Sequence, residues 1–480
     1  MYGTVPRMKV PRSAVAKWKH SIVFTLGARF FALVTPVQNL CLIRGLPRMM
    51  NRVVQLVGVA SCAAMLSLVD CTSAGSPHPA IRAAGSPFGA HTGALVGAVS
   101  TFHGMSVPNH VLTFDMYTHV GEVDPTIAAP YLDYAFVQDG DANKFDAAGI
   151  KTILYTDPNR TYVGQPMYTN DESTFAHDCK GDRITVGGRR VTTYQMDPRS
   201  PDLEPLWAAW VSGVLGAGYN YTYIFEDAGN NIHNDSAVPC GYTEPTWTAA
   251  SNANDIALGQ TIIYNGLGTL GDGYSKPPPS MLLNPTTFGG NLEGCYGNIN
   301  LQNPLPKTSI WYNFETSELT MSALQKPFFC RGLASPPAQN AYAERIYQAA
   351  SFLLTYNLAT SVISEKFTTP SHLSVFPEQT LVALNPLIPA PTKVNNLKTS
   401  HWTFGRQYAN CYLYGQSIGT CAVVVNADNP TAPHSFPWPG VYNHTLVLQG
   451  AGIVDGGTAS ATGPAPPASI PGTSAVIAIQ

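Results

Sequence analysis

The sequence predicts an α/β protein built on a parallel (β/α)8 barrel of the TIM type, followed by a small all-β sandwich. Between residues 104 and 390, short apolar runs alternate with intervals that are mostly long enough for a helix, and polar residues recur at the same end of each run. From residue 391 to 480, strand-like runs are separated by Pro, Gly and Asn turns without helical intervals. The first pattern is typical of a parallel sheet and the second of an antiparallel module.

Eight apolar runs are expected to form the barrel strands. In chain order they cover residues 111–115, 131–137, 150–155, 221–226, 261–265, 289–293, 327–331 and 361–365. Apolar residues at spacings of three and four predict amphipathic helices over 202–216 and 341–356, the second with Glu344 and Arg345 on its polar face. The segment 160–199 has too many turn-forming residues for one helix, so we expect a structured loop over the barrel mouth.

The first hundred residues have the layout of a bacterial export signal. Arginines precede an apolar run over residues 53–69, and small polar residues follow it. We expect translation to begin near Met49, so that residues 1–75 hold an upstream extension and the signal. Residues 76–103, rich in Gly, Ala and Pro, are expected to form a linker. A retained anchor is the alternative, although the run is short for a spanning helix of about 20 residues.

A lipid anchor is a second possibility for the exported chain. Leu68–Cys71 resembles the lipobox of bacterial lipoproteins, in which the cysteine becomes the lipidated first residue. Asp70 departs from the small residue expected before the lipobox cysteine. Val59–Cys62 matches the lipobox sequence pattern better, but it lies inside the apolar run. A membrane tether through lipidated Cys71 and simple secretion both stay open, and both predict a location outside the cytoplasm.

Six cysteines follow the export signal, and an even number in an exported chain favours disulfides over metal sites. Six cysteines allow 15 connectivities. One pair flanks an expected hairpin, and the other two are chosen by proximity in the sequence. The expected pairs are Cys411–Cys421, Cys179–Cys240 and Cys295–Cys330.

Composition narrows the class of ligand. Charged residues make up 12% of the chain and the formal net charge is -3, so nothing favours a nucleic-acid partner. The aromatic content of 10%, with 42 Gly and 39 Pro, suits a loop-rich protein with a neutral surface that could bind carbohydrate. The 12 histidines show no metal-ligand spacing, so we expect neither a metal nor another cofactor.

Two carboxyl groups are the usual means of breaking a glycosidic bond: one is protonated and assists the leaving oxygen, and the other is ionised. Glu226 and Asp227 end the fourth predicted strand and Glu293 ends the sixth, so that side chains from these strands can share a pocket. Adjacent strand residues point to opposite sides, so only one of Glu226 and Asp227 faces inward. Asp227 is favoured, because the small residues that follow it leave it exposed at the rim.

Other residues at strand ends and in loops are candidate contacts for a sugar. An acid in such a position can instead cap a helix or hold a turn, and an arginine can instead form an ion pair. Trp247 and Trp311 lie in loop-like regions and are favoured for stacking on a sugar, whereas Trp207 and Trp210 have the spacing of a helix core. The candidate contacts are Asp115, Asp139, Asp157, Asn265, Arg331 and Trp247.

Several short motifs together resemble the glycoside hydrolases related to the α-galactosidase superfamily. The resemblance covers residues 110–480 and rests on Tyr223–Asp227, Ile263–Gly266, Asn291–Gly294, 345–356, Phe404–Arg406 and Val424–Asn426. In that superfamily the nucleophile ends strand four and the acid/base ends strand six. This implies Asp227 or Glu226 as nucleophile and Glu293 as general acid/base. The family usually has Asp at the first position of the strand-four pair, where this chain has Glu226, so the choice within the pair stays open.

The resulting expectation is an exported glycoside hydrolase that acts on an oligo- or polysaccharide. The alternative is a non-catalytic carbohydrate-binding surface protein that keeps the barrel without the reaction, because a fold does not fix a function.

Overall fold

The computed structural model describes residues 109–118, 123–137, 140–186, 191–227, 239–258, 262–265, 287–297, 308–333, 341–366, 375–387, 391–428 and 433–480. The predicted export signal, the Cys71 lipobox, the linker and Asp139 lie outside these ranges. Within them, no helix combines the length and the apolar character needed to cross a membrane.

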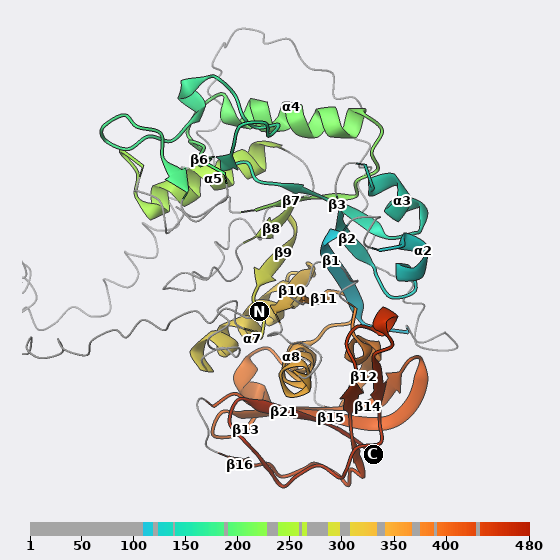
Figure 1. Ribbon diagram of the computed structural model, residues 1–480. Helices are drawn as coiled ribbons and strands as arrows, with labels where there is room; N and C mark the ends of the chain where they lie inside the picture. The colour runs from blue at the N-terminus through green and yellow to red at the C-terminus, as the bar shows by residue number, and fades with distance from the viewer. Residues whose placement is uncertain are drawn as a thin grey trace, which may run out of the picture. The chain divides into compact units, whose positions relative to one another are not determined.

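The amino-terminal part of the described chain forms a closed parallel barrel, which confirms the parallel barrel predicted from the sequence (Figure 1). Its strands neighbour one another in the order β1-β11-β10-β9-β8-β7-β3-β2. They are β1 (Leu112–Thr118), β2 (Tyr134–Val137), β3 (Lys151–Thr156), β7 (Tyr223–Glu226), β8 (Ile262–Asn265), β9 (Thr287–Glu293), β10 (Phe328–Leu333) and β11 (Ser361–Lys366).

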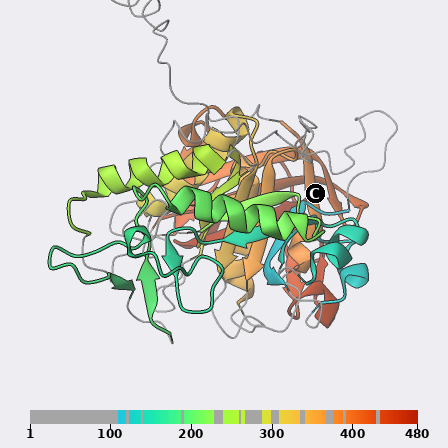
Figure 2. The ribbon, with the colours of Figure 1, turned by 90° about the horizontal axis from the view of Figure 1, so that it is seen from above.

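Helices lie between successive barrel strands and cover their outer side. They are α2 (Pro125–Ala128), α3 (Ala142–Ala147), α4 (Leu203–Gly216), α5 (Glu244–Leu258), α7 (Thr308–Ala323) and α8 (Tyr342–Thr355). Trp207 of α4 is fully buried with Leu154 of β3 and Ile224 of β7, as its helical spacing predicted. Helices α4 and α5 run side by side (Figure 2).

The long segment between β3 and α4 is structured. It contains β4 (Arg160–Thr161), the 3-10 turn η2 (Glu172–Thr174), β5 (Thr185–Val186) and β6 (Thr193–Gln195), and its strands form a small antiparallel sheet in the order β4-β6-β5. The Cys179–Cys240 disulfide ties this segment to the residues that precede α5. Cys295–Cys330 and Cys411–Cys421 also form, so all three predicted pairs are confirmed.

The carboxyl-terminal part is a set of antiparallel sheets. The largest has the order β12-β14-β15-β21-β17, with β13 paired to β14, and two-stranded sheets β16-β20 and β18-β19 accompany it. The first strand, β12, precedes residue 391, so this module begins inside the range expected for the barrel. The strands are β12 (Leu381–Pro386), β13 (Lys398–Ser400), β14 (Thr403–Leu413), β15 (Gln416–Asn426), β16 (His434–Ser435), β17 (His444–Thr445), β18 (Val447–Gln449), β19 (Thr458–Ser460), β20 (Ser469–Ile470) and β21 (Ser474–Ile479).

Helix α8 is packed on both sides, because it lies between the barrel and the carboxyl-terminal sheet (Figure 1). Glu344 and Arg345, which were expected on the face opposite the apolar stripe, are therefore buried as well. Arg345 donates to both carboxylate oxygens of Glu378, with 2.5 Å between Nε and Oε1. From the sheet, Arg406 Nη1 donates at 3.1 Å to the carbonyl oxygen of Leu354. Buried polar contacts thus join the two parts of the described chain.

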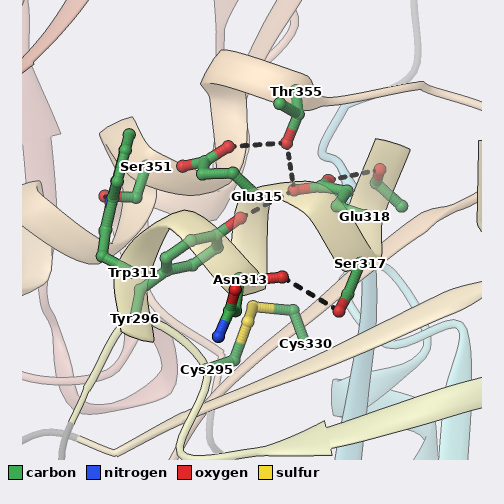
Figure 3. The surroundings of a disulfide bond; sticks show 11 residues. Cys295, Tyr296, Trp311, Asn313, Glu315, Ser317, Glu318, Cys330, Ser351 and Thr355 are labelled. Carbon is green, nitrogen blue, oxygen red and sulfur yellow. Dashed lines mark hydrogen bonds between the residues drawn. A yellow bond between two sulfur atoms is a disulfide. The ribbon is translucent and has the colours of Figure 1, made fainter. Parts of the chain in front are cut away.

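Two carboxyl groups of α7, Glu315 and Glu318, are also completely buried (Figure 3). Thr355 Oγ1 lies 2.8 Å from an oxygen of each, and Ser361 Oγ and Tyr296 Oη donate to Glu318 at 2.6 and 3.0 Å. A threonine hydroxyl has one proton and can donate to only one of the two acids, so the other acid must itself be protonated to use that contact. Burial accordingly raises the pKa of Glu315 well above its usual value and that of Glu318 to about 7.

This pair predicts a dependence of stability on pH. Glu318 has a pKa of about 7 in the folded protein and a usual value of 4.5. Its stabilising contribution to the free energy of unfolding is therefore fully present below pH 4.5 and is lost as the pH rises through 7. A shift of this size corresponds to about 3 kcal/mol. Glu318→Gln should remove the decrease in the free energy of unfolding that Glu318 causes as the pH rises. Chemical denaturation at a series of pH values measures this free energy. In the control Glu204→Gln, on α4, the free energy of unfolding should change with pH as in the wild type. The same change with pH in Glu318→Gln would contradict the prediction.

Candidate active site

The interior of the barrel is filled by side chains that alternate along each strand with outward-facing ones. Phe225 of β7 and Phe329 of β10 belong to the interior cluster, whereas Ile224 packs outside, near the helices. The rings of Tyr223 on β7 and Phe288 on β9 stack with their centroids 3.8 Å apart. Interior side chains of β7 and β9 therefore meet across the intervening strand β8.

The same alternation places charged residues above this aromatic layer, at the carboxyl ends of the strands. Asp227 follows Phe225 by two residues, and its backbone N–H extends the β3–β7 ladder by donating to the carbonyl oxygen of Thr156 at 2.8 Å. Leu292 packs outside, so Glu293 is on the interior side. Arg331 follows the interior residue Phe329 by two positions. Acids and cations from β7, β9 and β10 thus face one end of the barrel, where parallel barrels carry their active sites.

An irregularity in β9 contributes to this placement. Ile262 of β8 pairs with Thr287, whereas the next residue, Ile263, pairs with Gly289, so one extra residue is accommodated at Phe288. An extra residue in a strand reverses the side to which later side chains point. As a result, Phe288 and Glu293 both contribute to the interior, although Glu293 lies five positions after Phe288 and an unbroken alternation would place them on opposite sides.

Asp227 is held by two donors. Tyr155 Oη donates to its carboxylate, and Arg160 Nη2 donates to Oδ2 at 3.1 Å. Arg160 also contacts Asp157, with 2.7 Å between Nε and Oδ2. Burial opposes the charge of Arg160, but the carboxylates of Asp157 and Asp227 more than offset this, and the pKa of Arg160 is raised. The Asp227 side chain keeps 17% of its surface exposed, so a ligand can reach it.

At Glu293, burial and the charge of Asp227 together outweigh the neighbouring cation. Arg331 Nη1 donates to its Oε1 at 2.5 Å, and the Glu293 side chain is 30% exposed. Burial raises the pKa of Glu293 above its usual value, Arg331 lowers it, and the negative charge of Asp227 raises it; the net direction is upward. The negative charge of Asp227 therefore contributes to the upward direction of the Glu293 pKa.

The structure separates the two adjacent acids on β7. Glu226 follows the outward-facing Ile224 by two residues and is fully buried, so its position does not support the candidate role of Glu226 as nucleophile. Asp227, one residue later, is partly exposed on the interior side. The small residues after Asp227, on which the preference for it rested, lie outside the described ranges.

The candidate sugar contacts divide into those near the coupled acids and those elsewhere. Asp157 and Arg331 join the charged cluster, and Arg331 makes the ion pair considered as its alternative role. Asp115 alternates with the interior residues Phe114 and Met116 and lies on the outer side, so its role as a sugar contact is not supported by its position. Asn265 ends β8, between β7 and β9.

The stacking role expected for Trp247 and Trp311 is wrong. Trp247 is fully buried on α5 and packs on Tyr242, with ring centroids 5.0 Å apart. Trp311 is fully buried on α7 and donates from Nε1 to Ser351 Oγ at 2.9 Å. Both regions are helical, and long-range packing covers the indole rings.

Sequence reasoning missed Arg160 and Tyr155. A usable signal was present, because Arg160 follows Asp157 by three residues just after a predicted strand, a spacing that suits an ion pair at the barrel rim. Among the residues that the structure places, one group has the geometry of metal ligands: His401, Asp428 and His434. It belongs to the carboxyl-terminal sheets.

No protein-family model and no curated protein matches this sequence. Solved structures of glycoside hydrolases are similar to the chain. The glycoside hydrolase domain of PelA from Pseudomonas aeruginosa has 10% identity and a TM-score of 0.39 over 55% of this chain and 97% of its own. Ega3 from Aspergillus fumigatus, in complex with galactosamine, has 13% identity and a TM-score of 0.34 over 56% and 96%. The GH36 α-galactosidase AgaB from Geobacillus stearothermophilus has 11% identity and a TM-score of 0.39 over 78% and 56%. Values this low assign no residue roles to this chain.

The charge cluster predicts that Arg160 is structurally important. Arg160→Gln would leave two partly buried carboxylates without their shared cation, and we expect it to lower the free energy of unfolding by about 2–4 kcal/mol. Lys144→Gln is the control, because Lys144 is exposed and lies 4.0 Å from Asp141; its effect should stay below about 0.5 kcal/mol. Urea denaturation at pH 7 measures both. Equal effects of the two substitutions would mean that Arg160 does not hold the cluster together.

Proposed function

We propose that this chain is an exported glycoside hydrolase that cleaves O-glycosidic bonds of an oligo- or polysaccharide. Asp227 is the proposed nucleophile or base, and Glu293 is the proposed general acid. The observation that carries the proposal is the electrostatic coupling of these two partly exposed acids, which come from β7 and β9 at the same end of the barrel. Asp157 and Arg331 would contact the sugar or orient the acids, and Asn265 and Asp139 remain candidate contacts.

The chemistry needs one protonated and one ionised carboxyl group. Glu293 suits the first role, because its raised pKa favours the protonated form that can donate to the leaving oxygen. Asp227 suits the second role, because Arg160 and Tyr155 donate hydrogen bonds to its oxygens. In both possible routes Glu293 gives its proton to the departing sugar oxygen. As nucleophile, Asp227 attacks the anomeric carbon, and Glu293 then takes a proton from the water that displaces Asp227; as base, Asp227 takes a proton from the water that attacks the anomeric carbon directly.

One observation favours the alternative, a non-catalytic carbohydrate-binding protein. Both acids form ion pairs, Asp227 with Arg160 and Glu293 with Arg331. An ion pair keeps a carboxylate charged, which opposes the work of a general acid. The hydrolase is still preferred, because the net shift of the pKa of Glu293 is upward despite Arg331.

The proposed location follows from two separate features. Three disulfides suit an oxidising compartment, and the amino-terminal segment has the layout of an export signal. Secretion and a membrane tether through lipidated Cys71 are both compatible with these features. The proposed partner is a carbohydrate, and no nucleic-acid partner is proposed.

Substitution of the two acids tests the reaction. With a substrate found by reducing-sugar release from a glycan panel, we expect Glu293→Gln to lower kcat by about 10²–10⁴ and Asp227→Asn to lower it at least as much. Asp141→Asn, at the start of α3, should leave kcat within about twofold. Circular dichroism checks that each variant is folded.

The outcomes separate the two functions. Undiminished hydrolysis by folded Glu293→Gln would remove Glu293 from the reaction. A wild-type protein that binds glycans in the panel and hydrolyses none of them would favour the carbohydrate-binding alternative.

The cation beside Glu293 predicts a shift of the pH profile. Arg331 lowers the pKa of Glu293, so Arg331→Met should raise that pKa and keep the acid protonated at higher pH. The pH at which kcat/KM falls on the alkaline side of its pH profile should therefore rise by about one unit. Rate measurements from pH 4 to 9 on the wild type and Arg331→Met provide the comparison. If that pH stays the same or becomes lower, another group controls the alkaline side of the profile.

A further inference from the structure

Three side chains of the carboxyl-terminal sheets, His401, Asp428 and His434, lie close together. Asp428 Oδ2 lies 2.8 Å from His434 Nε2 and 3.8 Å from His401 Nε2. The two imidazole rings have their centroids 5.3 Å apart. One ligand atom from each residue lies within 4.8 Å of the other two.

Strand pairing explains why these residues meet. His401 just precedes β14 and Asp428 just follows β15, and the antiparallel pair Thr403–Asn426 puts these two strand ends side by side. The backbone N–H of Ala427 also donates to the carbonyl oxygen of Trp402 at 2.9 Å, which holds the turn of His401 beside the end of β15.

A buried asparagine links the third residue to the other two. Asn426 Oδ1 accepts the backbone N–H of Asp428 at 3.1 Å, and Asn426 Nδ2 donates to the carbonyl oxygen of Ile470 at 2.9 Å. Ile470 is in turn the β20 partner of His434. Asn426 is fully buried, so one side chain fixes both the turn that carries Asp428 and the strand next to His434.

This arrangement has the chemistry of a transition-metal site. Neutral imidazole nitrogen and carboxylate oxygen are common ligands of divalent zinc, and two histidines with one carboxylate leave a fourth position for water. Ligand atoms around tetrahedral zinc are about 3.3 Å apart, given metal–ligand bonds of about 2.0–2.1 Å. The distances of 2.8 and 3.8 Å bracket this value. Because the His401 side chain is 66% exposed, a metal ion can enter and water can reach the open position.

We propose that His401, Asp428 and His434 bind a divalent transition-metal ion, with Zn²⁺ as the representative. The ion would connect the β13–β14 turn, the end of β15 and strand β16, and so stabilise the carboxyl-terminal module. Metal binding would replace the His434–Asp428 contact, because that contact uses the same atoms. The site is independent of the proposed glycosidase function, and it would revise the expectation of no metal drawn from sequence spacing.

Zinc titration of the full chain tests the site. Protein freed of any affinity tag and stripped with EDTA is titrated with ZnCl2 by calorimetry, and its Tm is measured with and without Zn²⁺. We expect one Zn²⁺ per chain at this site and a higher Tm with the ion. His401→Ala should weaken this binding by at least about tenfold and abolish the rise in Tm.

Matched variants separate this site from other zinc-binding groups on the chain. His401 is exposed, so His401→Ala should fold, and it keeps every cysteine of the wild type; a difference between the two cannot come from thiols. His444→Ala on β17 removes a histidine of the same module and should bind Zn²⁺ as the wild type does. Asp428→Asn should lose binding as His401→Ala does. Zinc binding and Tm shifts that are equal in wild type and His401→Ala, or lost equally in His444→Ala, would overturn the proposal.

Discussion

The alternation of side chains in a closed parallel barrel is the constraint on which the rest of this structure depends. On β7 it sends Tyr223, Phe225 and Asp227 inward, and the stacking of Tyr223 on Phe288 brings β7 and β9 together across β8. Aromatic rings fill the interior below, so charged groups can gather only at the carboxyl end. The charged residues at that end therefore lie next to a layer of packed rings.

Charge balance is the second consequence of this geometry. Partly buried carboxylates are costly unless cations accompany them, and Arg160 and Arg331 supply the cations for Asp157, Asp227 and Glu293. The balance is unequal. Arg160 donates to two acids and is shared between them, whereas burial and the charge of Asp227 outweigh Arg331 in setting the pKa of Glu293. Burial and the Asp227 charge thus favour the protonated form of Glu293, which is the form a general acid needs.

Sequence patterns predicted the features that depend on local order. Apolar runs with helical intervals predicted the parallel barrel, a predicted hairpin indicated Cys411–Cys421, and proximity along the chain indicated the other two disulfides. The two-residue period of a strand predicted that only one of Glu226 and Asp227 faces the barrel interior. Features that depend on contacts between distant segments were not predicted: the contacts of buried Arg345 with Glu378 and Gly450, and the packing that covers Trp247. His401 and His434 are likewise far apart in sequence and meet only through strand pairing.

The central claim is that Asp227 and Glu293 act as one coupled pair. Titration of glutamate carboxyl ¹³C signals by NMR, with Glu293 assigned through Glu293→Gln, measures this coupling in the absence of any substrate. If the account is right, the pKa of Glu293 lies above its usual 4.5 in the wild type and falls in Asp227→Asn, because the neighbouring negative charge is gone. A Glu293 pKa that is the same in both proteins, or at or below 4.5 in the wild type, would contradict it.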